Sequence, residues 1–224
     1  SWRLLVNLNR SELLLDHLVV DARESRTIYA SGHRHKAPGG FFRSTDGGAT
    51  WKESKELKDE SIHAMTQSPI DPNVLLVGTI HGVWISKNSG ADWQKMSSTS
   101  MPVNIDSLAM DPRNTSTMYA GTWWRAYKTT DSGKSWRLIK NGMIDDSDVF
   151  AITVNPRNPE HVISSACSGI YESFNGGEKW AKIQGIPSQS RRTRDILQHP
   201  TIPGTIYAAT TEGFWLSING GKTW

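Results

Sequence analysis

The feature that most constrains this chain is an eight-residue pattern that occurs five times at a nearly fixed period. The pattern is Ser or Thr, any residue, Asp or Asn, any residue, Gly, two further residues and Trp, as in "STDGGATW" (44–51). Its copies end at Trp51, Trp93, Trp136, Trp180 and Trp224, so they are 42 to 44 residues apart. Such regular self-similarity indicates a repeat architecture, in which each unit buries its faces only by stacking on its neighbours.

Each repeat unit predicts four short strands. An apolar run such as "IHAMTQ" (62–67) precedes a turn rich in Pro, Asp and Asn, and a run of β-branched, aromatic and small residues follows. A third run, such as "GVWIS" (82–86), leads into the octet, and a fourth follows the octet Trp. Turn chemistry and strand composition support this assignment, and no helical periodicity competes with it. Four strands in about 43 residues are typical of a β-propeller blade.

The octet resembles the Asp-box, also called the BNR repeat. Families that carry it include sialidases, xyloglucan-cleaving glycosidases, sortilin-type receptors and photosystem II assembly factors. The resemblance implies a β-propeller in which each box is the hairpin between the two outer strands of a blade. We therefore expect an all-β fold of five four-stranded blades in a single domain, 1–224, with the ring closed by the N-terminal strand, Trp2–Asn7.

The composition of the octet favours a structural role over catalysis. Its third position alternates between Asp46, Asn88, Asp131, Asn175 and Asn219. A turn hydrogen bond tolerates this exchange but a general acid does not. The Gly provides a positive φ, and we expect the Trp to lie over the turn and pack against the next blade. A calcium loop is the alternative, but one acid per turn supplies too few oxygen ligands.

Alternatives to a complete native propeller remain open. One further hypothesis is an excised or designed propeller fragment without a function of its own. If Trp2–Asn7 closes the ring we expect a monomer, and otherwise an oligomer formed by strand exchange.

Positions that break the repeat are the candidates for a binding site. One strongly variable position lies six residues before each Pro turn, near the predicted channel mouth. It is occupied by Asp16, His63, Asp106, Phe150 and Arg194. The alternative is a solvated entrance that binds nothing.

The loop between the second and third strands also varies. Where most units have Gly82, Gly169 or Gly213, the third has Trp123-Trp124-Arg125. We expect one Trp to project outward beside Arg125 as a stacking surface for a sugar or peptide. The alternative is that both indoles pack between blades.

Two further loops complete the candidate face. In the first unit, an insertion contains His33 and His35, but with no third ligand nearby it predicts no metal site. Arg191, Arg192 and Arg194, with Arg34, Lys36 and Arg125, would make this face basic and suited to an acidic partner. The photosystem II assembly family carries a similar arginine patch. The alternative is a solvated loop.

Composition and residue placement exclude several classes of function. The net charge of +3 is too small to indicate nucleic acid binding, and no apolar run is long enough to span a membrane. All five Tyr residues fall in strand positions, which argues against the Tyr nucleophile of sialidases. A glycoside hydrolase-like enzyme with paired acids from Asp106, Asp148 and Asp195 remains an alternative.

The sequence therefore predicts a non-catalytic β-propeller that binds a protein or glycan on its loop face, without cofactor or metal. We expect an extracytoplasmic location, periplasmic or secreted. The candidate ligand-binding residues are Trp123, Trp124, Arg125, His63, Asp106, Arg191, Arg192 and Arg194.

Overall fold

The described part of the chain is all β-structure. The computed structural model describes residues 8, 10–144, 148–183, 186 and 193–224. Within these ranges every element is a strand, and there is no helix that could cross a membrane. The chain divides into two compact units, one of residues 1–96 and 103–105 and the other of residues 97–102 and 106–224.

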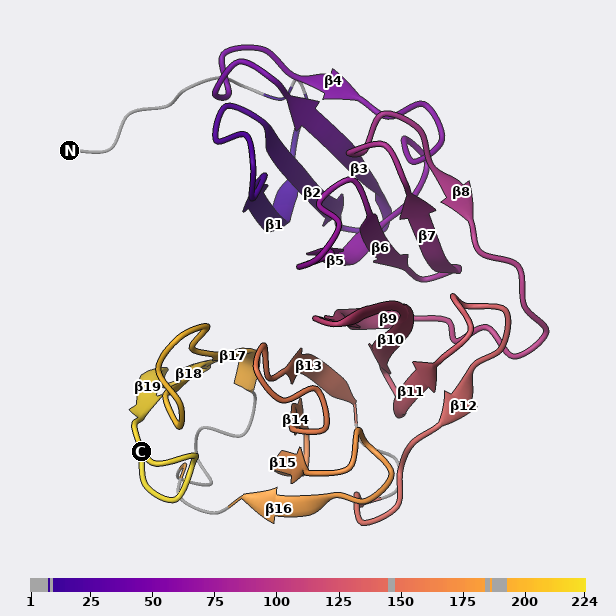
Figure 1. The fold of residues 1–224 in the computed structure, drawn as a ribbon. Coiled ribbons are helices and arrows are strands. Elements are labelled where there is room, and N and C mark those ends of the chain that lie inside the picture. Colours follow the sequence, from indigo (N-terminus) through magenta and orange to yellow (C-terminus); the bar gives the residue numbers. More distant parts are fainter. Residues whose placement is uncertain (1–7, 9, 145–147, 184–185, 187–192) are drawn as a thin grey trace. The chain divides into compact units, whose positions relative to one another are not determined.

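The first unit contains two four-stranded antiparallel sheets, each a simple meander in chain order (Figure 1). The strands of the first blade are β1 (Leu14–Val20), β2 (Ile28–Arg34), β3 (Ala37–Ser44) and β4 (Lys52–Glu53). Those of the second blade are β5 (Ile62–Gln67), β6 (Leu75–Thr79), β7 (Gly82–Ser86) and β8 (Gln94–Lys95).

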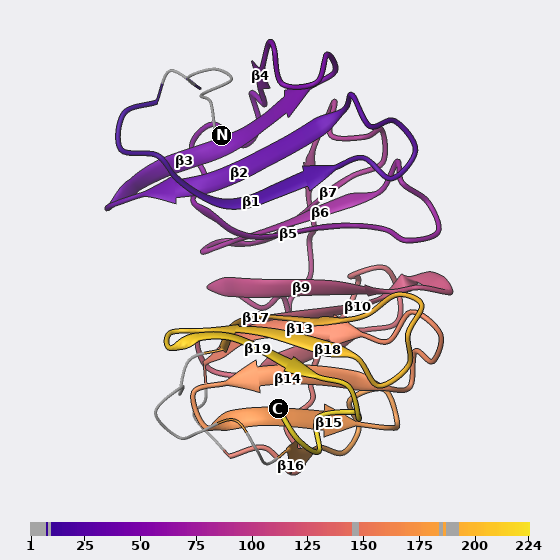
Figure 2. The ribbon, with the colours of Figure 1, turned by 90° about the vertical axis from the view of Figure 1, so that its left-hand side faces the viewer.

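The second unit contains three sheets with the same strand order, and strands from all three are labelled in Figure 2. The third blade consists of β9 (Ile105–Asp111), β10 (Asn114–Thr122), β11 (Ala126–Thr129) and β12 (Arg137–Leu138). The fourth consists of β13 (Val149–Val154), β14 (Val162–Ala166), β15 (Gly169–Ser173) and β16 (Ala181–Ile183). The fifth has three described strands, β17 (Thr193–Gln198), β18 (Ile206–Thr210) and β19 (Gly213–Ser217).

These sheets confirm the predicted blades. The predicted first strand at 62–67 and the predicted third strand at 82–86 coincide with β5 and β7. The proposed closing strand, Trp2–Asn7, lies outside the described residues, so ring closure stays a prediction.

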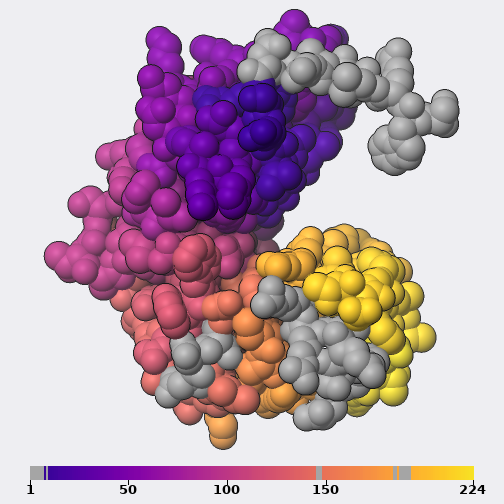
Figure 3. Space-filling model, turned by 180° about the vertical axis from the view of Figure 1, so that it is seen from behind, coloured from indigo at the N-terminus to yellow at the C-terminus, as the bar shows by residue number. Residues whose placement is uncertain are grey.

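The cores lie between successive blades. In the first unit, Tyr29 and Phe41 of the first blade pack with Ile62, Leu75 and Trp93 of the second. In the second unit, the fourth and fifth blades share a cluster that includes Ile163, Ile196 and Ile206. Figure 3 shows the fifth blade (yellow) against the fourth (orange). Within each unit, successive blades therefore bury their facing surfaces against each other, as the repeat predicts.

One end of every blade, which we call the Asp-box end, carries the octet turn and the turn between the first two strands. Ser44 Oγ accepts a hydrogen bond from the Gly48 amide at 2.9 Å and donates to Asp46 Oδ1 at 2.7 Å. Asp46 in turn accepts bonds from the amide and hydroxyl of Thr50. The same Ser or Thr contacts recur in the other four boxes. The octet is therefore a turn clamp, as predicted.

The acids of the box are poorly suited to proton transfer. Hydrogen bonds from Ser135, and then from Thr129, lower the pKa of Asp131 to about 2. Bonds from Thr50 and Ser44 lower the pKa of Asp46 still further. Both carboxyls are therefore ionised at neutral pH, and Asn219 makes the equivalent contacts with Thr223.

The predicted direction of Trp packing was wrong. Trp93 meets Phe41 of the preceding blade edge-on, with ring centroids 4.8 Å apart. Trp180 donates its indole N–H to the Ile139 carbonyl at 3.0 Å, and Ile139 follows the outer strand of the preceding blade. Trp93 and Trp180 therefore pack against the blade before their own. Sequence spacing does not fix this direction, because both neighbours are one period away.

Candidate functional site

The other end of each blade, which we call the hairpin end, carries the turn between the second and third strands. The start of the first strand lies beside this turn, because Leu14 pairs with His33 and Val149 pairs with Ala166. The variable position found in the sequence therefore lies at the hairpin end. The predicted candidates whose position is described all lie here.

The variable position is a β-bulge in four blades. The register of the first strand shifts between Leu15 and His17, between Ile62 and Ala64, between Val149 and Ala151, and between Thr193 and Asp195. The residues within these shifts are Asp16, His63, Phe150 and Arg194, and we call these the bulge positions. A bulge leaves one residue out of the ladder and redirects its side chain, which is why bulges are common beside functional sites. The bulge in the backbone thus recurs in these four repeats, while the side chain at the bulge position differs in each.

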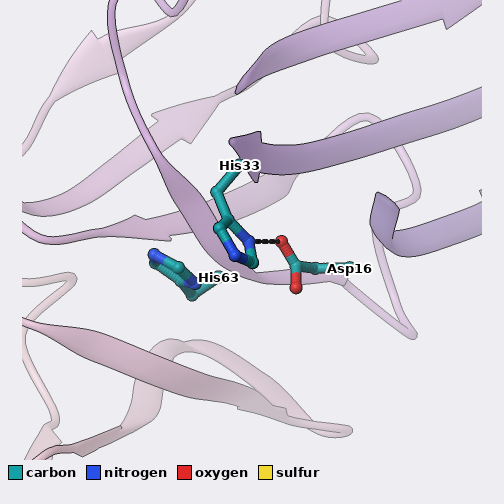
Figure 4. Close-up of side chains that lie close together, drawn as sticks. All are labelled: Asp16, His33 and His63. Atoms are coloured by element: carbon teal, nitrogen blue, oxygen red, sulfur yellow. Dashed lines mark hydrogen bonds and ion pairs between the residues drawn. The ribbon is translucent and has the colours of Figure 1, made fainter. Parts of the chain in front are cut away.

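In the first unit, the bulge positions of two adjacent blades converge on one hairpin residue. His33, near the end of β2, lies with Nδ1 2.6 Å from Asp16 Oδ2, and its ring centroid is 4.5 Å from that of His63 (Figure 4). Burial, and then the neighbouring His33, lower the pKa of His63, although the Asp16 charge opposes this. His63 is therefore a largely neutral imidazole at neutral pH. His35, the other histidine of the insertion, lies exposed in the turn.

In the second unit, the hairpin of the third blade presents two indoles. Trp123 is 45% exposed and Trp124 is 58% exposed, so both project outward, where we had expected only one. Trp123 Nε1 donates to Asp106 Oδ1 at 3.1 Å. This bond joins a hairpin residue to the variable position of the same blade and orients one of the two indoles.

The repeat fixes the hairpin that carries the two indoles. Thr122 Oγ1 donates to the Arg125 carbonyl at 2.9 Å and accepts from the Trp124 and Arg125 amides. Thr79 and Thr210 bond their own hairpins in a similar way. Where those hairpins have glycines with φ near 130°, Arg125 stands without a positive φ. The third blade therefore holds a modified form of the common turn.

The remaining bulge positions form a pair between the fourth and fifth blades. The Arg194 guanidinium lies 4.9 Å from the centroid of the Phe150 ring, within cation–π range. Ser165 Oγ donates to the Thr193 carbonyl at 2.7 Å and ties the two blades together beside this pair. Arg191 and Arg192 lie outside the described residues, so the predicted basic cluster stays a prediction.

The acids of the enzyme alternative have different surroundings. Asp106 holds the Trp123 indole, and Asp148 Oδ2 lies 3.5 Å from Cys167 Sγ. Asp195 is exposed on β17 and pairs with Ala209. Asp106 is thus committed to orienting an aromatic side chain.

Comparisons with known proteins agree with this architecture. The family model described as Sortilin-Vps10 (sortilin, neurotensin receptor 3) matches residues 39–147, a little less than half of the chain. An ancestral GH74 enzyme is similar with a TM-score of 0.71 at 21% identity, over 88% of this chain and 27% of its own. A GH74 enzyme of Niastella koreensis is similar with a TM-score of 0.70 at 18% identity, over 94% of this chain and 37% of its own. The fold is that of an Asp-box β-propeller.

A third similar structure is not described as an enzyme. It is the extracellular domain of a hybrid two component system from B. thetaiotaomicron, with a TM-score of 0.70 at 17% identity, over 92% of this chain and 26% of its own. The present chain thus spans well under half the length of these solved chains. No curated protein matches the sequence significantly. The comparisons therefore show the fold alone, and the residues at the hairpin end carry the argument about function.

Sequence reasoning missed the role of His33. It paired His33 with His35, because they are two positions apart, and found no third ligand. The structure instead brings in Asp16 and His63, which are 17 and 30 positions away. The sequence does contain a signal for this cluster, because Asp16 and His63 occupy the same variable position in adjacent repeats.

Proposed function

We propose that this Asp-box propeller is a non-catalytic binding module whose ligand, a glycan or an extended peptide, stacks on Trp123 and Trp124. The observation that carries the proposal is the exposure of both indoles on a two-residue hairpin turn. Large exposed aromatics lose hydration cheaply and offer flat faces to sugars and peptide side chains.

The contacts around the two indoles support a role in ligand binding rather than in packing of the core. The Thr122 hydrogen bonds set the turn, and the Asp106 bond orients the Trp123 ring. The surface is thus partly organised before a ligand arrives, which lowers the entropy cost of association. Arg125 adds a positive charge beside the indoles, which favours an acidic ligand or partner.

The same reading supports an extracytoplasmic location, periplasmic or secreted. One of the similar solved structures is an extracellular domain, and glycans and extended peptides are common ligands in that setting. We therefore propose that the chain works outside the cytoplasm.

A glycan array and a pull-down with the whole chain test the binding proposal. We expect binding to one glycan class or one partner, weakened about tenfold or more by Trp124→Ala. The matched control is Phe174→Ala, because Phe174 is 65% exposed but lies in the octet turn, at the Asp-box end. Equal binding by wild type and Trp124→Ala would contradict the proposal.

The second class of function has its own readout. The GH74 likeness concerns the fold alone, but it makes xyloglucan a reasonable probe for hydrolysis. Release of new reducing ends, lost in Asp106→Asn, would support a glycoside hydrolase-like enzyme instead. We expect no release, because Asp106 is engaged with the Trp123 indole.

A further inference from the structure

We propose that Asp16, His33 and His63 form a binding site for a divalent transition-metal ion of the Zn²⁺ class. The site lies within the first unit, at the hairpin end of its two blades (Figure 4). One ligand atom from each residue, two imidazole nitrogens and one carboxylate oxygen, lies within 4.8 Å of the other two. The proposal is independent of the ligand proposed for Trp123 and Trp124.

The donor set fits this class of metal. Two imidazoles and one carboxylate are a common protein ligand set for zinc and for related first-row ions, with the remaining positions filled by water or a ligand. Zinc–ligand bonds of about 2.0–2.2 Å place ligand atoms roughly 3–4 Å apart. Small side-chain rotations therefore suffice to bring the three ligand atoms into coordination from their present separations.

The backbone is arranged to bring these three side chains together. Asp16 and His63 occupy the bulge positions of β1 and β5, and the ladder between β2 and β3 shifts its register between Gly32 and His33. In the other blades the described ladders between the second and third strands show no such shift. The register shift lies at the insertion of the first blade, residues 33–40, which also contains His33. The bulges at Asp16 and His63 belong to the repeat, but the additional shift in the first blade, where Gly39 is left out of the ladder, falls directly beside His33.

Neighbouring contacts hold the cluster in place. His17 Nε2 lies 3.0 Å from the His63 carbonyl oxygen, which links β1 to β5 beside the site. The side chains of His33 and Asp16 are 27% and 25% exposed, so an ion can reach the cluster from solvent.

The alternative to a metal site is an ordinary hydrogen-bonded pair of a histidine and a carboxylate. The chain contains such a pair for comparison. His81 Nδ1 lies 3.0 Å from Glu60 Oε2 in the same unit. That pair is not part of any metal-ligand group of three in the described residues, whereas the Asp16 pair has His63 beside it. A simple ion pair accounts for His81 and Glu60. It does not account for the position of the His63 ring beside His33 and Asp16.

Isothermal titration of the chelator-treated whole chain with zinc chloride tests the site. We expect one Zn²⁺ per chain, with affinity reduced about 10–100-fold or more in His33→Gln and in His63→Ala. His81→Ala is the matched control and should bind as wild type does. Replacing Zn²⁺ by Co²⁺ should give visible absorption bands that His33→Gln removes.

Folding is checked separately, so that each outcome is decisive. The metal-free melting temperature of His33→Gln should match wild type, because His33 is partly exposed at a strand end. If His63→Ala does not fold, His33→Gln alone decides the question. Absence of stoichiometric Zn²⁺ binding to wild type, or binding unchanged in a folded His33→Gln, would overturn the proposal.

Discussion

The two ends of each blade use the repeat in opposite ways. At the Asp-box end, both the side chains and their hydrogen bonds recur. In all five repeats the backbone N–H of the residue after the Asp or Asn donates to a carbonyl in the turn before the second strand or in the first residues of that strand, as Gly47 does to Arg26 at 2.7 Å. At the hairpin end the backbone bulge recurs but its side chain is Asp, His, Phe or Arg. The recurring side chains of the Asp-box end therefore hold the fold together, and the bulge positions with varying side chains are where we propose that ligands bind.

Replacing a buried Trp of the octet should have the largest effect on stability, and it tests the structural role of the Asp-box end. Trp180 is 3% exposed and bonds the Ile139 carbonyl in the preceding blade. We expect Trp180→Ala to lower the free energy of unfolding by about 3–5 kcal/mol, measured by urea denaturation. Trp51 is half-buried and bonds its own turn, at Gly48, so Trp51→Ala should cost clearly less. Equal losses would mean that packing on the preceding blade is not what the Trp provides.

A buried carboxylate at the Asp-box end should give the next largest effect. Asp21 is 6% exposed and accepts bonds from Tyr29, Gln67 and two backbone amides. Asn in its place sets an N–H group against some of these donors, so Asp21→Asn should cost about 1–3 kcal/mol at pH 7.

The effect of Asp21 should depend on pH in a defined direction. Burial by itself raises the pKa of Asp21, but the four hydrogen bonds more than offset this and lower it. Its stabilisation is therefore present above about pH 4 and lost as pH falls through the lowered pKa. The difference between wild type and Asp21→Asn, followed by urea denaturation across pH, should shrink in acid. A difference that grows in acid would contradict this account.

Within one octet, two neighbouring substitutions should behave differently. Ser44 is buried and its Oγ accepts the Gly48 amide, so Ser44→Ala should cost about 1 kcal/mol. Asp46→Asn should leave the melting temperature unchanged, because Asn219 already accepts from the Thr223 amide and donates to its hydroxyl, in place of the hydroxyl bond that Asp46 accepts. Differential scanning calorimetry measures both. A melting temperature that falls further for Asp46→Asn than for Ser44→Ala would restore a special role for the acid.

The smallest effect on stability should come from the hairpin end. Arg194 is exposed and lies over the Phe150 ring, so Arg194→Gln should cost about 0.5–1 kcal/mol at most. Arg194→Lys, which keeps a cation, should cost less. A loss as large as that of Trp180→Ala would show that this end also holds the fold together.

Sequence reasoning predicted the blades because the repeat carries redundant information. The exchange of Asp46 for Asn88 identified a turn bond, and the apolar runs located the first strands. The direction of Trp packing was not predictable, because preceding and following blades are equally distant in sequence.

The candidate site was predicted less completely. Alignment identified Asp16 and His63 as variable, but only the bulges and the hairpin show that both meet His33. The outward direction of both Trp123 and Trp124 likewise depends on a turn whose Arg125 replaces the usual glycine. Side-chain direction at such irregular positions follows from local backbone geometry, which alternation rules do not describe.

The measurement that tests the division between the two ends most directly compares two triply substituted chains in one thermal melt. One chain replaces Ser44, Ser86 and Ser173 by Ala, and the other replaces Trp123, Trp124 and Arg194 by Ala. We predict that the first melts about 6–12 °C below wild type, since three well-separated losses of about 1 kcal/mol add. The second should melt within a few degrees of wild type. A second chain that melts as low as the first would contradict the account.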